Sequence, residues 1–193
     1  MKTEDTPWTH NSHYYRQLLS AVHDKCELAL DIGCGTGDFA AQLAAFSEHV
    51  EGLDLDAAAI RSARQRYSHI NNLSFSEGNL DMCRLDNDRY NFISLIASLH
   101  HMEPRSSLLK VRNALKPGGV VVILGCYKEG SIVDYLFSLV AIPINLVYRF
   151  LIYRKRASIK QTVATQPARE TYSIMRRLVA EILPDCKMQR RLL

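Results

Sequence analysis

The feature that most constrains this chain is a short apolar run that leads into a cluster of glycines. Residues Leu28–Ile32 are apolar except for Asp31, and glycines follow at positions 33, 35 and 37. Closely spaced glycines permit positive φ angles and leave no Cβ between the backbone and a bound molecule. Beyond them, Phe39 and Leu43 begin an apolar pattern at helical spacing. The segment therefore predicts a strand, a tight turn that is open to a ligand, and a helix.

The alternation of short apolar runs and helical patterns continues through residue 126. Four more strands are expected, at His49–Leu55, Leu73–Ser76, Tyr90–Ala97 and Val120–Cys126. Strands that alternate with helices predict βαβ units, a parallel sheet and ligand binding at the carboxyl ends of the strands. Asp56 is expected to cap one helix, Pro104 to open another, and residues 116–119 to end it. The apolar positions expected on the helices are Phe39, Leu43 and Phe46, then Ile60, Ala63 and Tyr67, and finally Leu108, Val111 and Leu115.

Length and composition favour one domain. The chain has 193 residues, of which 47% are hydrophobic and 23% are charged, as is ordinary for a soluble globular protein. Within a single domain over 1–193 we expect an N-terminal cover (1–25), a cofactor-binding core (26–127), an apolar lid or insert with a basic linker (128–166), and a C-terminal helix and strand (167–193). The polar N-terminus and five cysteines without a CxxC pair favour a cytoplasmic protein that has neither a disulfide framework nor a zinc site.

Polar side chains stand where three of the expected strands end. Asp31 is placed to bind a cationic amino group, and Asp54 to accept hydrogen bonds from both hydroxyls of a ribose. Asn79 can meet the amino edge of an adenine, and Leu80 offers an apolar contact to its ring. Asp38 occupies the position of the third glycine in a dinucleotide-binding loop, where its charge would repel a pyrophosphate. The pattern therefore favours a nucleoside ligand without phosphates.

The segments DIGCGTG, GLDLD, EGNLD and LHHM…LKPGG together resemble class I S-adenosylmethionine-dependent methyltransferases of the small-molecule, type 11-like group, which includes quinone-ring methyltransferases. The resemblance covers roughly residues 10 to 127 and implies an α/β fold with a doubly wound, mostly parallel Rossmann-like sheet of strand order 3-2-1-4-5-7-6. It implies S-adenosylmethionine as cofactor and S-adenosylhomocysteine as product. The family most often has an aspartate where Asn79 stands. The cofactor-binding residues expected on this basis are Asp31, Gly33, Cys34, Gly35, Thr36, Gly37, Asp54, Leu55, Asn79, Leu80, Ala97, His13 and Tyr14.

Two adjacent histidines, His100 and His101, follow the fourth expected strand. Methyl transfer from a sulfonium requires alignment and exclusion of water, and a base only when the acceptor must lose a proton. Either histidine is a candidate base, and His101 is preferred because the family's most frequent histidine falls there. Alternatively, one of them caps the next helix and packs against the cofactor. An Asn-Pro-Pro-aromatic motif is absent after this strand, which disfavours a nucleic-acid amine as acceptor.

The two ends of the chain are expected to select the acceptor. His13 and Tyr14 either cover the cofactor or pack against the body. Residues 132–156 contain an apolar run that is too short for a membrane span and that Pro143 interrupts. This segment forms either a lid over a lipophilic acceptor, with peripheral membrane contact, or a dimer face or outer helix. From Arg149 onward there are eleven Lys and Arg against three Asp and Glu, which indicates either an anionic partner or a solvated face.

Near the C-terminus, a helix is expected from Pro167 to about Leu183, with Tyr172, Met175 and Val179 on one face. Residues 187–193 are expected to form a final strand. Only six strands are found where the resemblance implies seven, so the last strand of the sheet is expected to be missing, with an unpaired edge.

The sequence thus predicts methyl transfer from S-adenosylmethionine to a small lipophilic acceptor, through an oxygen or carbon nucleophile. Two alternatives remain open at this point. One is a nicotinamide-dependent oxidoreductase of the same fold. The other is an S-adenosylmethionine-binding protein without catalysis, in which the apolar segment binds a partner chain.

Overall fold

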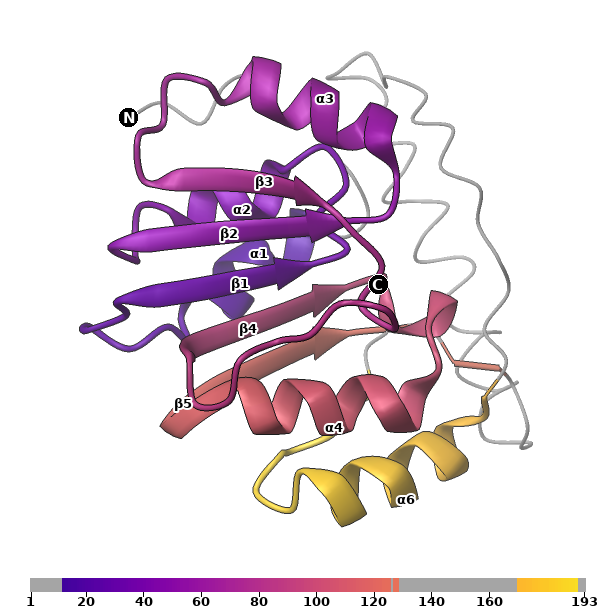
Figure 1. Ribbon diagram of the computed structural model, residues 1–193. Helices are drawn as coiled ribbons and strands as arrows, with labels where there is room; N and C mark the ends of the chain where they lie inside the picture. Colours follow the sequence, from indigo (N-terminus) through magenta and orange to yellow (C-terminus); the bar gives the residue numbers. More distant parts are fainter. Residues whose placement is uncertain (1–11, 126, 129–169, 191–193) are drawn as a thin grey trace, which may run out of the picture. The chain divides into compact units, whose positions relative to one another are not determined.

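The computed structural model describes residues 12–125, 127–128 and 170–190 (Figure 1). It falls into two compact units, one of residues Tyr14–Cys126 and the other of Met1–His13 with Tyr127–Leu193. The predicted lid and basic linker lie outside the described residues apart from residue 128, as does the expected helix start at Pro167. None of the described helices is long and apolar enough to cross a bilayer.

The first unit is built on a parallel sheet of five strands (Figure 1). The strand order is β3-β2-β1-β4-β5, and every neighbouring pair is parallel. This confirms the predicted α/β class and the order of the first five strands. The strands are β1 (Leu28–Ile32), β2 (His49–Asp54), β3 (Leu73–Glu77), β4 (Tyr90–Ile96) and β5 (Leu115–Leu124).

Helices connect β1 to β2, β2 to β3 and β4 to β5 as βαβ units, whereas residues 78–89 join β3 to β4 without a helix. Asp56 caps its helix as predicted, because its carboxylate accepts a hydrogen bond from the Ala58 N–H at 2.8 Å. Pro104 opens the next long helix, and Glu103 caps it by accepting from the N–H groups of Arg105 and Ser106. The helices of this unit are α1 (Ser12–Leu19), α2 (Asp38–Leu43), α3 (Ala57–Arg66), the 3₁₀ turn η1 (Leu99–His101) and α4 (Pro104–Ala114).

The core lies on both faces of this sheet. All of β4 except Asn91 is buried, as expected for a strand covered on both sides. A cluster on one face joins α1, α2 and α3 to the sheet, and in it the Tyr15 ring meets the Phe39 ring edge-on at 5.0 Å. Leu108 and Val111 of α4 are fully buried as well. The sheet is therefore held rigidly enough to fix the positions of its strand ends.

Two expectations for this unit are wrong. Phe46 is 53% exposed, because α2 ends at Leu43 and the chain turns away before the helical pattern reaches it. Residues 116–119 lie within β5, which begins at Leu115, and do not form a helix terminus outside the sheet. Leu115 pairs with Tyr90 and Val120 pairs with Phe92, so the four residues between form a bulge in which Gly118 takes a φ of +76°.

The second unit contains the helix α6 (Tyr172–Ile182), capped by the Thr171 hydroxyl. Its end agrees with the expected end near Leu183. The expected final strand is wrong over residues 187–190, which form no strand. Here the chain turns back toward α6 instead of pairing with a strand, and the Arg190 guanidinium lies 4.1 Å from the centre of the Tyr172 ring.

Candidate cofactor site

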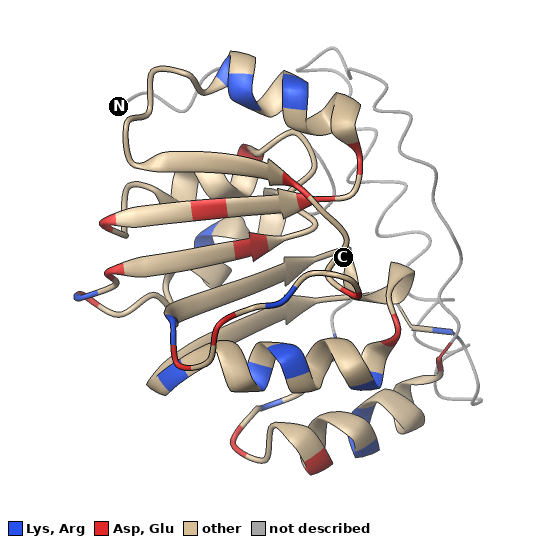
Figure 2. Ribbon diagram, viewed as in Figure 1, with Lys and Arg blue, Asp and Glu red and all other residues tan. Residues whose placement is uncertain are grey.

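Acidic residues lie at the carboxyl ends of β1, β2 and β3, as the red segments near the arrowheads in Figure 2 show. The glycine turn after β1 is fastened to the end of β2. The N–H groups of Gly33 and Cys34 both donate to the carbonyl of Leu53, at 2.7 and 3.1 Å. The Gly35 N–H donates to Asp54 Oδ2 at 2.7 Å. The turn and the acid that ends the neighbouring strand therefore form one hydrogen-bonded unit.

Asp54 is the acid predicted to hold a ribose. Its second oxygen, Oδ1, accepts a hydrogen bond from the Asp56 N–H at 2.8 Å. A carboxylate accepts about four hydrogen bonds, so these two leave room for two hydroxyl groups of a ligand. Leu55, the next residue, is 69% exposed and offers an apolar surface beside the carboxylate. The geometry thus suits a sugar next to an apolar ring.

The glycine turn is crowded at Gly33 and Gly37 and open at Gly35, since a Cβ on Gly37 would lie 2.5 Å from the Phe75 ring. A Cβ on Gly33 would lie 2.2 Å from the Cβ of Ser98, so packing alone excludes any side chain there. A Cβ on Gly35 would have no atom within 4 Å, although Gly35 also takes a positive φ of +54°. Gly35 therefore leaves space in which a ligand can approach the backbone.

Asp31 is the acid predicted to bind a cationic amino group. It is 1% exposed, and Ser94 Oγ donates a hydrogen bond to its Oδ1 at 2.7 Å. Burial, with a smaller contribution from the nearby Asp54 charge, raises the pKa of Asp31 to about 7. No ion pair of Asp31 is found within the described part of the chain. A buried carboxyl group of this kind favours the binding of a cation, because a cation stabilises the ionised form of the carboxyl group.

Asp38 has a different role from the one predicted. Its carboxylate forms an ion pair with Arg66 at 2.9 Å and accepts hydrogen bonds from the Tyr67 hydroxyl at 2.7 Å and the Thr36 hydroxyl at 2.8 Å. The same carboxylate and burial raise the pKa of the Tyr67 phenol above its ordinary value. Because the Asp38 charge is neutralised within the protein, the predicted repulsion of a pyrophosphate is weakened. Asp38 instead joins the start of α2 to the end of α3.

The turn after β3 carries Asn79 and Leu80. Asn79 Oδ1 accepts a hydrogen bond from the Asp81 N–H at 2.9 Å. This bond leaves the side-chain NH₂ group of Asn79 available to a ligand. Leu80 is 2% exposed and belongs to the core. In this arrangement the exposed apolar side chains are Leu55, which follows β2, and Met82, in the same turn as Asn79. The predicted contact between Leu80 and the ring stays a prediction.

The segment after β4 contains the remaining predicted residues of this edge. Ala97 takes a positive φ of +53°, an unusual conformation for a residue with a Cβ, and its N–H donates to the Leu124 carbonyl at 2.7 Å. The rings of His100 and His101 lie 4.0 Å apart. Glu103 caps α4, so the alternative in which a histidine caps this helix is wrong.

His100 and His101 differ in their surroundings. His101 is exposed, whereas His100 is half-buried and its Nδ1 has no hydrogen-bond partner among the residues that the structure describes. Burial, and then the neighbouring His101, lower the pKa of His100. His100 is therefore neutral at pH 7, which is the form able to accept a proton.

The predicted N-terminal contacts are on α1. His13 is exposed and Tyr14 is partly buried, while the neighbouring Tyr15 packs in the core. The contact of His13 and Tyr14 with a cofactor stays a prediction.

Sequence analysis missed two serines that shape the site. Ser94 faces Asp31 across the paired strands β4 and β1, and Ser98 donates from its Oγ to the Ile32 carbonyl at 2.7 Å. Both serines are buried. The signal was present, because a hydroxyl group within an otherwise apolar strand needs a hydrogen-bond partner.

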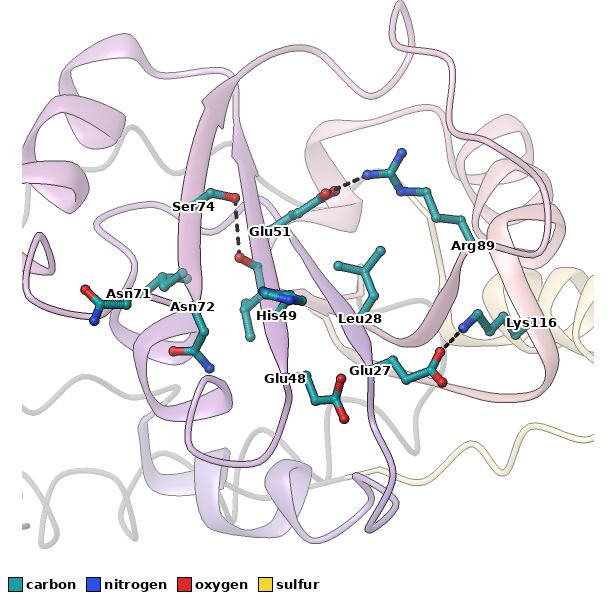
Figure 3. Close-up of a pocket in the computed structure, with 12 residues that line it drawn as sticks. Glu27, Leu28, Glu48, His49, Glu51, Asn71, Asn72, Ser74, Arg89 and Lys116 are labelled. Carbon is teal, nitrogen blue, oxygen red and sulfur yellow. Dashed lines mark hydrogen bonds and ion pairs between the residues drawn. The ribbon is translucent and has the colours of Figure 1, made fainter.

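A separate hollow of about 610 Å³ lies at the amino ends of the strands, at the opposite edge of the sheet (Figure 3). Two ion pairs line it: Lys116 donates to Glu27, and Arg89 donates to Glu51 at 2.6 Å. Asn72 donates to two loop carbonyls of the same edge. None of the predicted cofactor residues lines this hollow, so it is not the predicted site.

Comparison with known proteins identifies the domain in the central part of the chain and agrees with its fold. Residues 29–119 match the model of a methyltransferase domain, and this range includes both acids, the glycine turn, Asn79 and the two histidines. Residues 29–119 therefore form a class I S-adenosylmethionine-dependent methyltransferase domain. The family uses S-adenosylmethionine, as the sequence predicted, and membership removes the nicotinamide oxidoreductase from consideration.

Relatives of this methyltransferase include an uncharacterized methyltransferase of Mycobacterium tuberculosis, 31% identical over 121 residues, which are 62% of this chain and 61% of the relative. A demethylmenaquinone methyltransferase of Clavibacter sepedonicus is 31% identical over 98 residues, 50% of this chain and 40% of that protein. The match thus spans about three fifths of the mycobacterial relative. The crystal structure of the YcgJ protein from Bacillus subtilis shares the fold, with a TM-score of 0.65 and 18% identity over 88% of this chain and 67% of that one.

Proposed function

We propose that this methyltransferase transfers the methyl group of S-adenosylmethionine to a small lipophilic acceptor, at an oxygen or carbon nucleophile. The observation that carries the proposal is the pair of acids at adjacent strand ends, Asp31 and Asp54, on either side of the open turn at Gly35. One acid is buried and has no counter-ion among the described residues, and the other has room for two hydroxyl groups. S-adenosylmethionine carries an ammonium group and a ribose diol that match them.

In this proposal each residue of the edge has one task. Asp54 accepts hydrogen bonds from the ribose hydroxyls, and Asp31 binds the ammonium of the methionine part. Gly35 allows close approach of the ligand, and Leu55 and Asn79 contact the adenine. When bound, S-adenosylmethionine supplies a methyl group that is attached to a sulfonium sulfur. The leaving group is the neutral thioether S-adenosylhomocysteine. The protein aligns the acceptor with that methyl group and keeps water out.

The acceptor class is proposed from the relatives and from the histidines. One relative is named a demethylmenaquinone methyltransferase, and another, from Serratia proteamaculans, a ubiquinone biosynthesis O-methyltransferase. Their names indicate quinone-type acceptors, which are lipophilic and, in the reduced quinol form, carry phenolic hydroxyl groups. A neutral His100, or the exposed His101, accepts the proton that such an acceptor loses. The cytoplasmic location and the apolar lid over residues 132–156 stay predictions.

The test is a transfer assay with tritium in the methyl group of S-adenosylmethionine. Reduced naphthoquinones and benzoquinones with short isoprenoid tails serve as acceptors, a panel of amines serves as the contrast, and Asp54→Ala serves as the inactive control. The proposal predicts label in at least one quinol and none in the amines. If S-adenosylhomocysteine binds but no lipophilic acceptor is labelled, the protein binds the cofactor without this catalysis.

A further inference from the structure

The ammonium group of Lys110 on α4 lies among three backbone carbonyls of the turn that follows β3. Its Nζ donates to the carbonyl of Leu80 at 2.7 Å, of Asp81 at 2.6 Å and of Cys83 at 3.2 Å. An ammonium group has three protons to donate, so the three carbonyls use all of them. No ion pair of Lys110 is found in the described ranges, which makes the turn its partner.

This turn carries Asn79, and Lys110 is attached to its opposite side. Asn79 closes the turn from within, because its carbonyl accepts from the N–H groups of Met82 and Cys83 at 3.0 and 2.8 Å. Its side-chain oxygen accepts from the Asp81 N–H. The carbonyls of Leu80, Asp81 and Cys83 are left without partners within the turn, and Lys110 supplies the partner for each.

The helix that carries Lys110 is itself fixed. Leu108 and Val111, on either side of Lys110 in the sequence, are fully buried, and Glu103 caps the first turn of the helix. The lysine therefore joins a core helix to a turn whose other anchor is the buried side chain of Leu80 and whose tip, Met82, is 87% exposed. Without the ammonium, three converging carbonyls would repel one another and turn toward water.

We propose that Lys110 is a positioning residue for the adenine end of the cofactor, which holds the 79–83 turn so that the Asn79 amide meets the ring. The inference rests on the proposed function, because it assigns the turn to adenine. Lys110 does not touch the cofactor. It lowers the cost of binding by ordering the turn before the ligand arrives.

The test compares Lys110→Met with Lys116→Met by calorimetric titration. Lys116 is a lysine at the opposite edge of the sheet, paired with Glu27, and serves as the matched control. Two ligands are used: S-adenosylhomocysteine, and 5′-methylthioadenosine, which has the adenosine but not the amino acid. The expected result for Lys110→Met is a loss of about tenfold in affinity for both ligands, with no change for Lys116→Met. A loss confined to S-adenosylhomocysteine overturns the inference, as does unchanged affinity for both.

A double-mutant cycle separates positioning from general loosening. If Lys110 acts through Asn79, the double variant Lys110→Met with Asn79→Ala loses less affinity than the product of the two single losses. Lys110→Met combined with Asp31→Asn, at the methionine end, shows the full product. A full product in the Asn79 pair overturns the inference.

The wild type provides a measurement that does not depend on any variant folding. Hydrogen exchange of the Met82 and Cys83 amides is expected to slow when 5′-methylthioadenosine binds, because the ligand orders the turn further. Unchanged exchange at these amides, with the ligand bound, overturns the inference and leaves the proposed function standing. Failure of the wild type to bind S-adenosylhomocysteine at all contradicts the proposed function itself.

Discussion

The backbone N–H of Gly35 donates a hydrogen bond of 2.7 Å to the carboxylate of Asp54. The acid proposed to hold the ribose is therefore already oriented by the turn over which the ribose would lie. A second hydrogen bond, from the Asp56 N–H, fixes the other oxygen of the same carboxylate. Because the ligand finds this group in place, less conformational entropy is lost on binding.

The pKa of Asp31 makes cofactor affinity depend on pH. Burial raises this pKa from an ordinary 3.8 to about 7, and an ammonium group binds only the ionised form. The affinity for S-adenosylhomocysteine should therefore fall by about tenfold between pH 8 and pH 6, as one proton is taken up. Titration calorimetry at both pH values measures this. An affinity that is the same at both values would show that Asp31 does not bind the amino group.

The same residue should make the ligand-free protein less stable as pH rises. Between pH 4 and pH 7, Asp31 is protonated in the folded state and ionised in the unfolded state, so the folded state binds more protons and the free energy of unfolding falls with pH. Asp31→Asn removes this loss of stability, because asparagine does not ionise. At pH 8 we expect the variant to be more stable by about 1–3 kcal/mol in urea unfolding, although it binds cofactor less tightly.

If Asp31→Asn is no more stable than the wild type at pH 8, Asp31 is not buried without a counter-ion in the ligand-free protein. The comparison at pH 4 is the control, because there both side chains are neutral and the difference in stability should become small.

Two glycines of the turn should respond differently to alanine. Gly33→Ala places a Cβ 2.2 Å from Ser98 in addition to the strain of a positive φ, and should cost more than about 3 kcal/mol of stability. Gly35→Ala meets no atom and should cost only about 1–2 kcal/mol, from the strained backbone alone. Urea unfolding measures both variants.

The effects of the two variants on cofactor affinity should have the opposite order, with Gly35→Ala the more harmful. Gly35→Ala keeps the fold but puts a methyl group where the ligand approaches, so its affinity for S-adenosylhomocysteine should fall. A Gly35→Ala variant with wild-type affinity would mean that the ligand does not lie over this part of the turn.

The Asp38 cluster should matter for stability. Tyr67→Phe removes one hydrogen bond to the carboxylate and should cost about 1 kcal/mol in urea unfolding. Asp38→Ala should cost about 2–4 kcal/mol, because it removes the ion pair with Arg66 together with the hydrogen bonds from Tyr67 and Thr36. Arg61→Gln is the control. Arg61 lies on the exposed side of α3, so this substitution should have little effect on stability. Equal stability of Asp38→Ala and the wild type would show that this cluster does not hold α2 to α3.

Much of the sheet was predictable because its strands are marked by apolar runs and its loops by polar residues. β1 has the predicted bounds, and β2, β3 and β4 differ from the prediction by a single residue at one end. The error at β5 has a physical cause, since the Lys-Pro-Gly-Gly segment has the local features of a helix terminus. Pairing of Leu115 with Tyr90 is a long-range contact, and it extends the strand through that segment as a bulge.

The strand-end positions of the acids and glycines of the proposed site could be predicted from the sequence, but the contacts that support them could not. Asp31, Gly35 and Asp54 stand at strand ends that any parallel sheet would bring together. The neutralisation of Asp38 by Arg66 joins residues from two helices, and the contacts of Lys110 join α4 to a distant turn. Such contacts depend on how the helices pack, which no short segment of sequence encodes.

The central claim is that Asp54 and its glycine turn bind the ribose of S-adenosylmethionine. Titration of S-adenosylhomocysteine into the wild type, Asp54→Ala and Glu48→Ala tests it most directly. Glu48 is an exposed carboxylate at the other end of the same strand and is the matched control. The account predicts binding to the wild type and to Glu48→Ala with equal affinity, and a loss of about 1–3 kcal/mol for Asp54→Ala. Equal affinity of Asp54→Ala and the wild type would contradict it.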